Sequence, residues 1–290
     1  ITLPGKDGAA VFSAIHQTRP ELPVVILAEI ESIESALDCV KRGAFDFLIK
    51  PFDLERLVII VRNALAIHEL KARAQQLEDA LTEAHGFDQI VARSSVMRTL
   101  VEQARRTAMS DANVLIVGES GSGREVLARA IHFASARKKG PFVAINCGAI
   151  PETLLESELF GDEKDAGASA RRVGCFAQAD GGTLFLDEIN KMQPDAQTRL
   201  LRALENCDIH RMGGNSAMKI NTRIISTTSL DLQSRSQRAK FRADLCYRLA
   251  MPILQMPPLR ERHEDVGAMG DSCEKGVHGL GVRAFGRTQN

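Results

Sequence analysis

Residues 114–125 read Val114-Leu115-Ile116-Val117-Gly118-Glu119-Ser120-Gly121-Ser122-Gly123-Arg124-Glu125. Four consecutive apolar residues predict a strand that is covered on both faces of a parallel sheet. A glycine-rich turn follows directly, and an amphipathic helix then begins, with apolar residues at Val126, Leu127 and Ile131. Glycines let successive backbone N–H groups turn inward, and a helix N-terminus adds partial positive charge, so phosphate groups can bind largely to backbone. The stretch predicts a phosphate-binding loop at residues 118–125, with a glycine-rich turn that binds nothing as an equal alternative for this segment alone.

The last positions of this loop differ from the usual pattern. A standard phosphate loop ends in Gly-Lys-Ser or Gly-Lys-Thr, whereas this one ends in Gly123-Arg124-Glu125. A lysine presents a compact ammonium to the phosphates, whereas a guanidinium is larger, planar and rigidly forked. A displacement near 1 Å can cost about a hundredfold in rate. We therefore expect Arg124 to allow nucleotide binding and to slow hydrolysis.

A second apolar strand ends in two carboxylates, in the run Thr183-Leu184-Phe185-Leu186-Asp187-Glu188. Taken alone, this run is better explained as a buried strand that ends in a solvated acidic turn. Phosphoryl transfer, however, needs a phosphate loop and a metal-binding carboxylate at the ends of neighbouring strands. In combination with the loop, the run therefore predicts that Asp187 binds a magnesium ion and that Glu188 polarises the attacking water.

Apolar strands alternate with helical segments over most of the chain, which predicts an α/β fold with parallel sheets. The expected strands are residues 24–28, 46–49, 114–117, 142–145, 183–186 and 224–227.

A heptad pattern of apolar or small residues follows the first segment and predicts a helix that Gly86 ends. We expect a helical dimer linker at residues 61–86, with packing of this helix on its own domain as an equal alternative. The expected seam contains Ile60, Ile67, Leu70, Ala74, Leu77, Leu81 and Ala84, with Asn63 in one seam position.

Composition excludes several classes of function. The chain has 290 residues, and its 37 basic and 37 acidic side chains give no net charge, so no overall field draws it onto nucleic acid or an anionic membrane. The six cysteines form no C-x-x-C pair, which favours buried thiols in a reduced compartment over a zinc site. Because no apolar run approaches the roughly 18 residues of a membrane span, we expect a soluble cytoplasmic protein.

Further motifs occur in order along the chain: Phe142-Val143-Ala144-Ile145-Asn146-Cys147, Glu158-Leu159-Phe160-Gly161, residues 182–189, Arg211-Met212-Gly213-Gly214, Phe241-Arg242-Ala243-Asp244-Leu245 and Pro257-Pro258-Leu259-Arg260-Glu261-Arg262. Together with residues 118–125 they resemble the AAA+ domain of NtrC-type activators of sigma-54 RNA polymerase. In that family the loop reads Gly-Lys-Glu, so Glu125 follows the pattern and only Arg124 departs from it.

The resemblance implies a three-layer P-loop AAA+ core with a parallel sheet. It implies binding of ATP by residues 118–125, magnesium at Asp187 and a catalytic role for Glu188. It also implies a dimer or hexameric ring that couples ATP hydrolysis to remodelling of sigma-54 RNA polymerase. Arg242 and Arg248 match the arginine fingers that reach the ATP of a neighbouring subunit, and such a finger contributes roughly three to five orders of magnitude in rate.

Two regions depart from the family. Residues 165–170 read Asp-Ala-Gly-Ala-Ser-Ala where the family has Gly-Ala-Phe-Thr-Gly-Ala at the loop that touches sigma-54. Loss of the aromatic anchor makes productive contact with the polymerase questionable. After Val266 the pattern stops, and we expect the lid and the DNA-binding helix-turn-helix to be missing, through truncation or a lost reading frame. DNA contact would then need that missing domain.

The first sixty residues resemble the second half of a flavodoxin-like response-regulator receiver. Lys50-Pro51-Phe52 matches its signalling lysine and cis proline. We therefore expect a partial receiver at 1–60, a helical linker at 61–86, an AAA+ core at 87–266 and an atypical tail at 267–290.

Three hypotheses remain open at this point: an ATP-hydrolysing sigma-54 activator of a two-component phosphorelay, a regulator that binds nucleotide without turnover, and a decayed fragment with no activity of its own.

Overall fold

The computed structural model describes residues 2–3, 6–162, 173–210, 217–230, 232, 241–249 and 251–269. The chain forms two compact units, Ile1–Ala80 and Leu81–Asn290, and the boundary between them falls inside one long helix. Among the helices of these ranges, none has both the length and the apolarity that crossing a bilayer requires.

The first unit is built on a pair of parallel strands, β3 and β4. Its elements are β1 (Thr2–Leu3), β2 (Lys6–Asp7), α1 (Gly8–Thr18), β3 (Val25–Ala28), η1 (Ile30–Ser32), α2 (Ile33–Lys41) and β4 (Asp46–Ile49). Phe12 of α1 and Ile26 of β3 are part of its apolar core. The predicted cis peptide bond joins Lys50 and Pro51. The run Leu3-Pro4-Gly5 predicts a turn, and its last two residues lie outside the described residues.

Helix α3 (Leu54–His85) covers the predicted helical linker and ends directly before Gly86. Ile67, Leu70, Leu77 and Leu81 of the predicted seam are exposed, whereas Ile60 is only 8% exposed and is packed within its own chain. Val58, Val61 and Leu65 are also exposed, and their spacing of three and four residues places them on one face of the helix.

The second unit contains a parallel sheet with the strand order β11-β5-β10-β7-β6. Its strands are β5 (Val114–Val117), β6 (Phe142–Asn146), β7 (Thr183–Asp187), β10 (Arg223–Thr228) and β11 (Ile253–Gln255), and a separate hairpin pairs β8 (Asp208–His210) with β9 (Ala217–Lys219). Its helices are η2 (Phe87–Gln89), α4 (Ser95–Ala108), α5 (Arg124–Phe133), α6 (Glu152–Phe160), α7 (Cys175–Gln178), η3 (Ile189–Lys191), α8 (Pro194–Asn206), α10 (Ala243–Leu249) and η4 (Leu259–Glu261).

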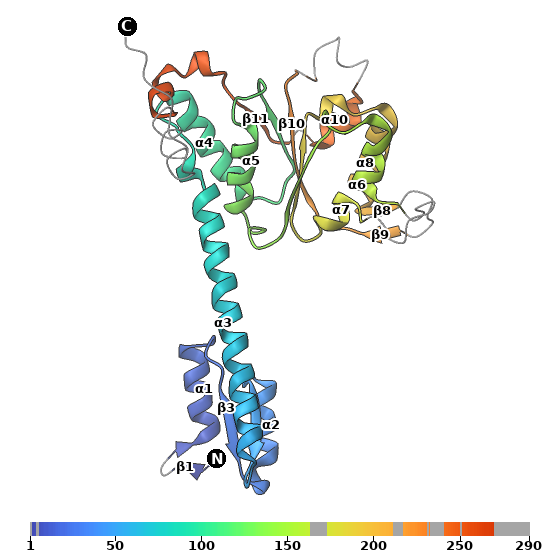
Figure 1. The fold of residues 1–290 in the computed structure, drawn as a ribbon. Coiled ribbons are helices and arrows are strands. Elements are labelled where there is room, and N and C mark those ends of the chain that lie inside the picture. The colour runs from blue at the N-terminus through green and yellow to red at the C-terminus, as the bar shows by residue number, and fades with distance from the viewer. Residues whose placement is uncertain are drawn as a thin grey trace. The chain divides into compact units, whose positions relative to one another are not determined.

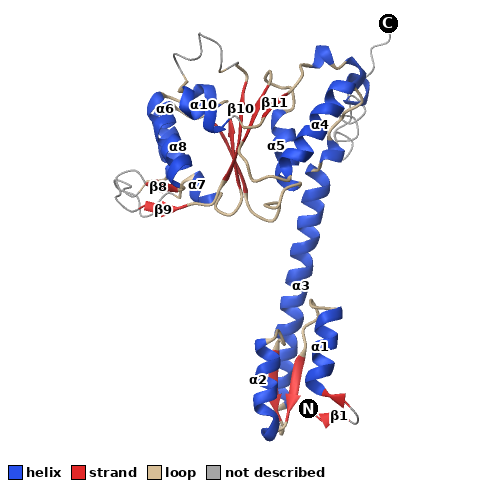
Figure 2. Cartoon of the chain, turned by 180° about the vertical axis from the view of Figure 1, so that it is seen from behind, coloured by secondary structure: helices blue, strands red, loops and turns tan. Residues whose placement is uncertain are grey.

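Helices cover both faces of this sheet, as predicted for the three-layer core. Figures 1 and 2 show α4 and α5 on one face and α6, α8 and α10 on the other. Leu127 and Ile116 lie in the apolar core on the first side, and Leu200 and Leu184 lie in the core on the second. Each core packs against one face of the sheet and holds the helices on that face.

Four of the five strands of this sheet were predicted, and two details differ from expectation. Strand β6 lies at an edge, and within it only Ile145 is buried, so the prediction of coverage on both faces is wrong there. Strand β11 was missed because it has only three residues, ends in Gln255 and follows Pro252, and so offers no apolar run.

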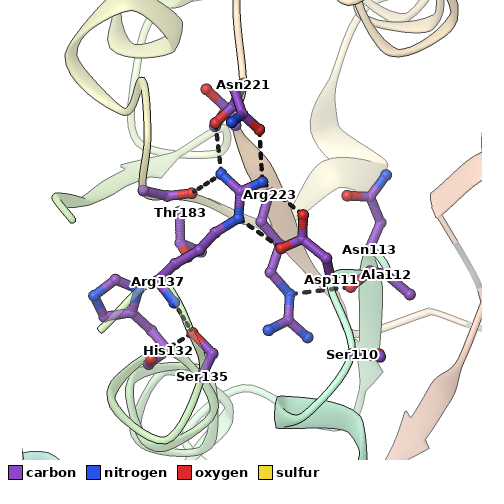
Figure 3. A network of polar contacts seen from close by, with 12 residues as sticks. Ser110, Asp111, Ala112, Asn113, His132, Ser135, Arg137, Thr183, Asn221 and Arg223 are labelled. Atoms are coloured by element: carbon purple, nitrogen blue, oxygen red, sulfur yellow. Dashed lines mark hydrogen bonds and ion pairs between the residues drawn. The ribbon is translucent and has the colours of Figure 1, made fainter. Parts of the chain in front are cut away.

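A polar network, drawn in Figure 3, joins the segments at the edge of the sheet where the strands begin. Arg137 binds the carboxylate of Asp111 through two contacts of 2.6 Å and donates to the side chain of Asn221 at 2.6 Å. Arg223, only 1% exposed, donates to the carbonyl of Ala112 at 3.0 Å. The network ties the residues before β5 to the start of β10.

Three predicted segments lie wholly or largely outside the described residues. They are the altered loop at 165–170, the motif at 211–214 and the tail from residue 270 onward. Residues 263–269 are helical, so regular structure continues past the boundary that we placed after Val266.

Candidate functional site

Four strands, β5, β10, β7 and β6, end side by side at the carboxyl edge of the sheet. Val117 at the end of β5 is in register with Thr228 of β10, and the N–H of Gly118 donates to the Thr228 carbonyl at 3.0 Å. Asp187 at the end of β7 is in register with Asn146 of β6. We predicted that the loop and the acids follow neighbouring strands, and this is wrong because β10 lies between β5 and β7. The end of β10 therefore contributes to the same site.

The loop after β5 has the backbone of an anion-binding turn. Gly121 has φ +77° and Gly123 has φ +101°, values that side chains disfavour and glycine adopts readily. Gly123 is the N-cap of α5, so the helix begins at Arg124. The backbone N–H groups of a first helical turn have no intrahelical acceptors, which makes them donors for a phosphate group.

Two of the predicted binding residues have their side chains in surface ion pairs. Glu119 pairs with Arg260 at 2.7 Å, and Glu125 pairs with Arg129 at 2.7 Å. Both carboxylates are more than half exposed. Because their side chains are engaged in these ion pairs, Glu119 and Glu125 could contact a phosphate group only through their backbone.

The side chain of Arg124 joins the loop to the acid pair. Its Nη1 donates to the carbonyl of Gly118 at 2.9 Å, and its Nη2 donates to Glu188 Oε1 at 2.6 Å. The same Nη2 lies 3.5 Å from Asp187 Oδ1. Arg124 is only 6% exposed, so this charge is held among protein acceptors and not in solvent. The loop and the two carboxylates thus form one site.

The acid pair is held by polar residues at the ends of the adjacent strands. Asn146 donates to Asp187 Oδ2 at 2.9 Å, and the Thr227 hydroxyl bonds Asp187 Oδ1. Ser229 donates to Glu188 Oε2 at 3.1 Å. Burial raises the pKa of Glu188, but hydrogen bonds from Arg124 and Ser229 and the charge of Arg124 outweigh burial and hold it below the usual value. Glu188 is therefore ionised at neutral pH, and hydrogen bonds hold both carboxylates in position.

A cavity of about 200 Å³ lies beside the loop and is lined mainly by apolar side chains, including Ile90, Val126 and Met256. Arg262 also lines this cavity and donates a hydrogen bond to the carbonyl of Ser122 at 2.6 Å. Two buried polar atoms of its lining, Ser122 Oγ and Arg262 Nε, have no hydrogen-bond partner in the described part of the chain. An apolar cavity with a few convergent polar groups is typical of a ligand site.

The two predicted arginine fingers lie at α10, apart from this cluster. Arg242 binds the carboxylate of Asp244 at 2.7 and 3.1 Å and donates to Thr198 at 3.3 Å. Arg248 donates to the carbonyl of Leu204 at 3.3 Å. Within the described ranges, neither forms a hydrogen bond or ion pair with the loop or the acids, so the structure does not bring them into the site of their own chain.

Comparison with known proteins identifies the family. The model of the Sigma-54 interaction domain matches residues 90–255, which contain both the loop and the acid pair. The chain belongs to the sigma-54 activator family. The model of the response regulator receiver domain matches residues 1–62 of this activator chain.

Relatives of this sigma-54 activator chain share its two-part organisation. It is 42% identical to the regulatory protein AtoC of Escherichia coli over 93% of its own length and 59% of AtoC. It is 44% identical to the transcriptional regulator NtrC of Escherichia coli over 92% of its own length and 56% of NtrC. A crystal structure of NtrX from Brucella abortus in complex with ADP matches with a TM-score of 0.67 and 35% identity, over 96% of this chain and 60% of that one. The activator chain thus spans less than two thirds of each of these relatives.

Several residues of the site were not singled out from the sequence of this sigma-54 activator. Asn146 and Thr227 orient Asp187, and Arg262 completes the cavity. A usable signal existed for the first two, because each is a polar residue at the end of an apolar strand. Arg262 ends the motif at 257–262, but its place at the cavity depends on a contact across 140 residues of sequence, which that motif does not show.

Proposed function

We propose that this chain binds ATP at residues 118–125 and hydrolyses it with Asp187 and Glu188, as the ATPase core of a sigma-54-dependent activator. The observation that carries the proposal is the contact of Arg124 with both acids, at 2.6 Å to Glu188 and 3.5 Å to Asp187. This contact supports the proposal because it joins residues 118–125 to both carboxylates through one side chain. Positioning and electrostatic stabilisation of this kind are what phosphoryl transfer requires.

The residues present fit a nucleotide. The backbone donors at the start of α5 would hold its phosphates, and the cavity with the unpartnered Ser122 Oγ and Arg262 Nε would take its base. They also fit magnesium, since a cation of this kind is commonly bound through one or two carboxylates together with substrate phosphates. Asp187 would be that carboxylate, and Asn146 orients it by its bond to Oδ2. When bound, magnesium would neutralise charge that develops on the phosphates.

A second candidate is a regulator that binds nucleotide without turnover. Its support is the ion pair between Arg124 and Glu188, which engages the carboxylate that would polarise water. A carboxylate bound to a guanidinium accepts a proton less readily than a free one.

Phosphate release by the purified chain, with and without magnesium, separates the two candidates. We expect magnesium-dependent release by the wild type and none by Glu188→Gln, which retains binding of an ATP analogue. Glu102→Gln, on the exposed surface of α4, is the matched control and should release phosphate at the wild-type rate. Binding of the analogue without any release would favour the second candidate, and absence of binding would overturn both.

Assembly and partners extend the proposal. We propose that copies of the chain associate through α3 and form a ring in which Arg242 and Arg248 act on the nucleotide of a neighbour. Support comes from the exposed stripe on α3 and from the absence of contact between these arginines and their own acid pair, within the described residues. The proposed partner is sigma-54 RNA polymerase, and the proposed divisions are 1–60, 61–86, 87–266 and 267–290.

A further inference from the structure

The guanidinium of Arg124 has all its observed partners within the protein. Nη1 is bound to the carbonyl of Gly118 and Nη2 to Glu188, with Asp187 as a longer contact. The guanidinium is therefore directed toward the acid pair. At 6% exposure it has little access to solvent, and the side chain of Glu188 is only 15% exposed. This pair is nearly buried, so breaking it leaves a charge with few alternative partners.

The first two phosphates of a nucleotide do not need this side chain. Backbone N–H groups of the loop and of the first turn of α5 provide their donors. Binding of a nucleoside diphosphate is thus compatible with an intact contact between Arg124 and Glu188. A third phosphate differs, because it brings further negative charge toward the acid pair and calls for a positive charge of its own.

We propose, on the basis of the proposed nucleotide site, that the ion pair of Arg124 with Glu188 makes this chain bind ADP in preference to ATP. A triphosphate must draw the guanidinium away from Glu188 and leave that carboxylate unpaired beside it. Ser229 donates a hydrogen bond to the other carboxylate oxygen of Glu188. It therefore keeps the carboxylate close to the third phosphate, where the two negative charges repel each other. A hydrogen bond to a charged group that is lost in this way reduces affinity on the order of tenfold to a hundredfold.

Lysine at position 124 is the informative change. Its ammonium carries the same charge, but it cannot bridge the Gly118 carbonyl and the Glu188 carboxylate with a planar fork. If Arg124 served simply as a phosphate ligand, its replacement would weaken the triphosphate more than the diphosphate. If the ion pair sets the preference, the same replacement weakens binding of the triphosphate less than binding of the diphosphate. The preference for ADP over ATP then becomes smaller.

Titration calorimetry with ADP and with a non-hydrolysable ATP analogue, both with magnesium, tests the proposal. We expect the wild type to bind ADP at least about tenfold more tightly, and Arg124→Lys and Glu188→Gln each to bring the ratio within about threefold. The double variant should show no larger effect than the greater single one, because both changes remove the same contact. Arg129→Gln removes an arginine of α5 that pairs with Glu125 and lies over the ring of Phe142, and it should keep the wild-type ratio.

Equal affinity of the wild type for the two nucleotides would overturn the proposal, as would a further loss of triphosphate affinity in Arg124→Lys. Additive effects in the double variant would overturn it as well, since they would show independent contributions. If neither nucleotide bound, the proposed function itself would fail, which is a different result from binding without preference.

Discussion

At the scale of the residue, Arg124 decides how the site is organised. A guanidinium can bind several acceptors at once because its N–H donors are fixed in a planar fork. Here that fork spans the Gly118 carbonyl and the Glu188 carboxylate. A single side chain thereby links the glycine-rich loop at 118–125 to Glu188.

We predict that Arg124→Lys raises the rate of magnesium-dependent phosphate release about tenfold or more. The reason is that Glu188 loses its guanidinium partner and becomes free to accept a proton from water, while the positive charge of the loop is kept. The measurement is steady-state phosphate release at saturating ATP. Arg129→Lys, in the next turn of α5, is the control and should leave the rate within about twofold of the wild type. A rate in Arg124→Lys below that of the wild type would contradict the role given to this contact.

At the scale of the element, α3 has both buried and exposed apolar residues. Ile60 and Ala64 are buried, whereas Val58, Val61 and Leu65 are 40% to 53% exposed. An apolar stripe of this kind is typical of a helix that packs against a partner.

We predict that replacing Val61 and Leu65 together by glutamate lowers the dimer fraction at least about tenfold. Association of the variant would bury two unpaired glutamate charges on each copy, which is unfavourable. Sedimentation velocity over a concentration series measures the effect. Asn63→Glu adds a charge to an exposed position away from the stripe and should leave the association unchanged. If the double variant associated as the wild type does, α3 would not be the interface.

The helical segment 263–269 is a second element whose position depends on one side chain. Asp265 is fully buried and accepts hydrogen bonds from the N–H groups of Arg93 and Ser94 and from the Ser94 hydroxyl, at 2.6 to 2.8 Å. This carboxylate ties the segment to the start of α4. Arg262 and Met269, at the two ends of the segment, line the cavity beside the loop.

We predict that Asp265→Asn lowers the free energy of unfolding by about 2 kcal/mol, because an amide presents its N–H₂ where a donor now points. Urea denaturation followed by circular dichroism measures this change. The affinity for ADP should fall as well. Without the bonds of Asp265, the segment that follows Arg262 is held less firmly, and Arg262 lines the proposed base cavity. Glu264→Gln, at an exposed neighbouring position, is the control for both measurements. If the two variants had the same stability and the same affinity for ADP, Asp265 would not anchor the segment.

At the scale of the whole molecule, the edge of the sheet opposite to the site contains a titratable group in the network of Figure 3. His132 of α5 is 1% exposed and bonds the Thr183 hydroxyl at 2.9 Å. Burial, together with the positive charge of Arg223, lowers the pKa of His132 to about 4. The folded chain thus keeps this ring neutral over a range in which the unfolded chain protonates it.

We predict that the wild type loses about 2 kcal/mol of stability, relative to His132→Asn, between pH 7.5 and pH 4.5. The contribution is complete above the unfolded pKa near 6.5 and is lost as the pH falls toward the folded value of about 4. Asparagine retains an acceptor for Thr183 and does not titrate. Urea denaturation of both proteins across this pH range measures the difference, and parallel pH profiles would exclude His132 as the cause.

The sequence predicts local structure well, but not the order of the strands. Strands β5, β7 and β10 are buried along most of their length, and their bounds are predicted to within one residue at each end. The insertion of β10 between β5 and β7 depends on long-range pairing, which no local pattern encodes. The contact of Arg124 with Glu188 depends in turn on that order, so the sequence shows an unusual residue without showing what it binds.

The position of β5 has a consequence for how the chain is made. Its two hydrogen-bonding neighbours, β10 and β11, are both translated much later, so Val114–Val117 emerges from the ribosome with neither edge paired. Pairing across such long separations is slow, and an unpaired apolar strand invites aggregation. Limited proteolysis of stalled nascent chains should therefore cleave near Val117 until residues 223–255 have emerged, and early protection would show that another segment shields this strand during synthesis.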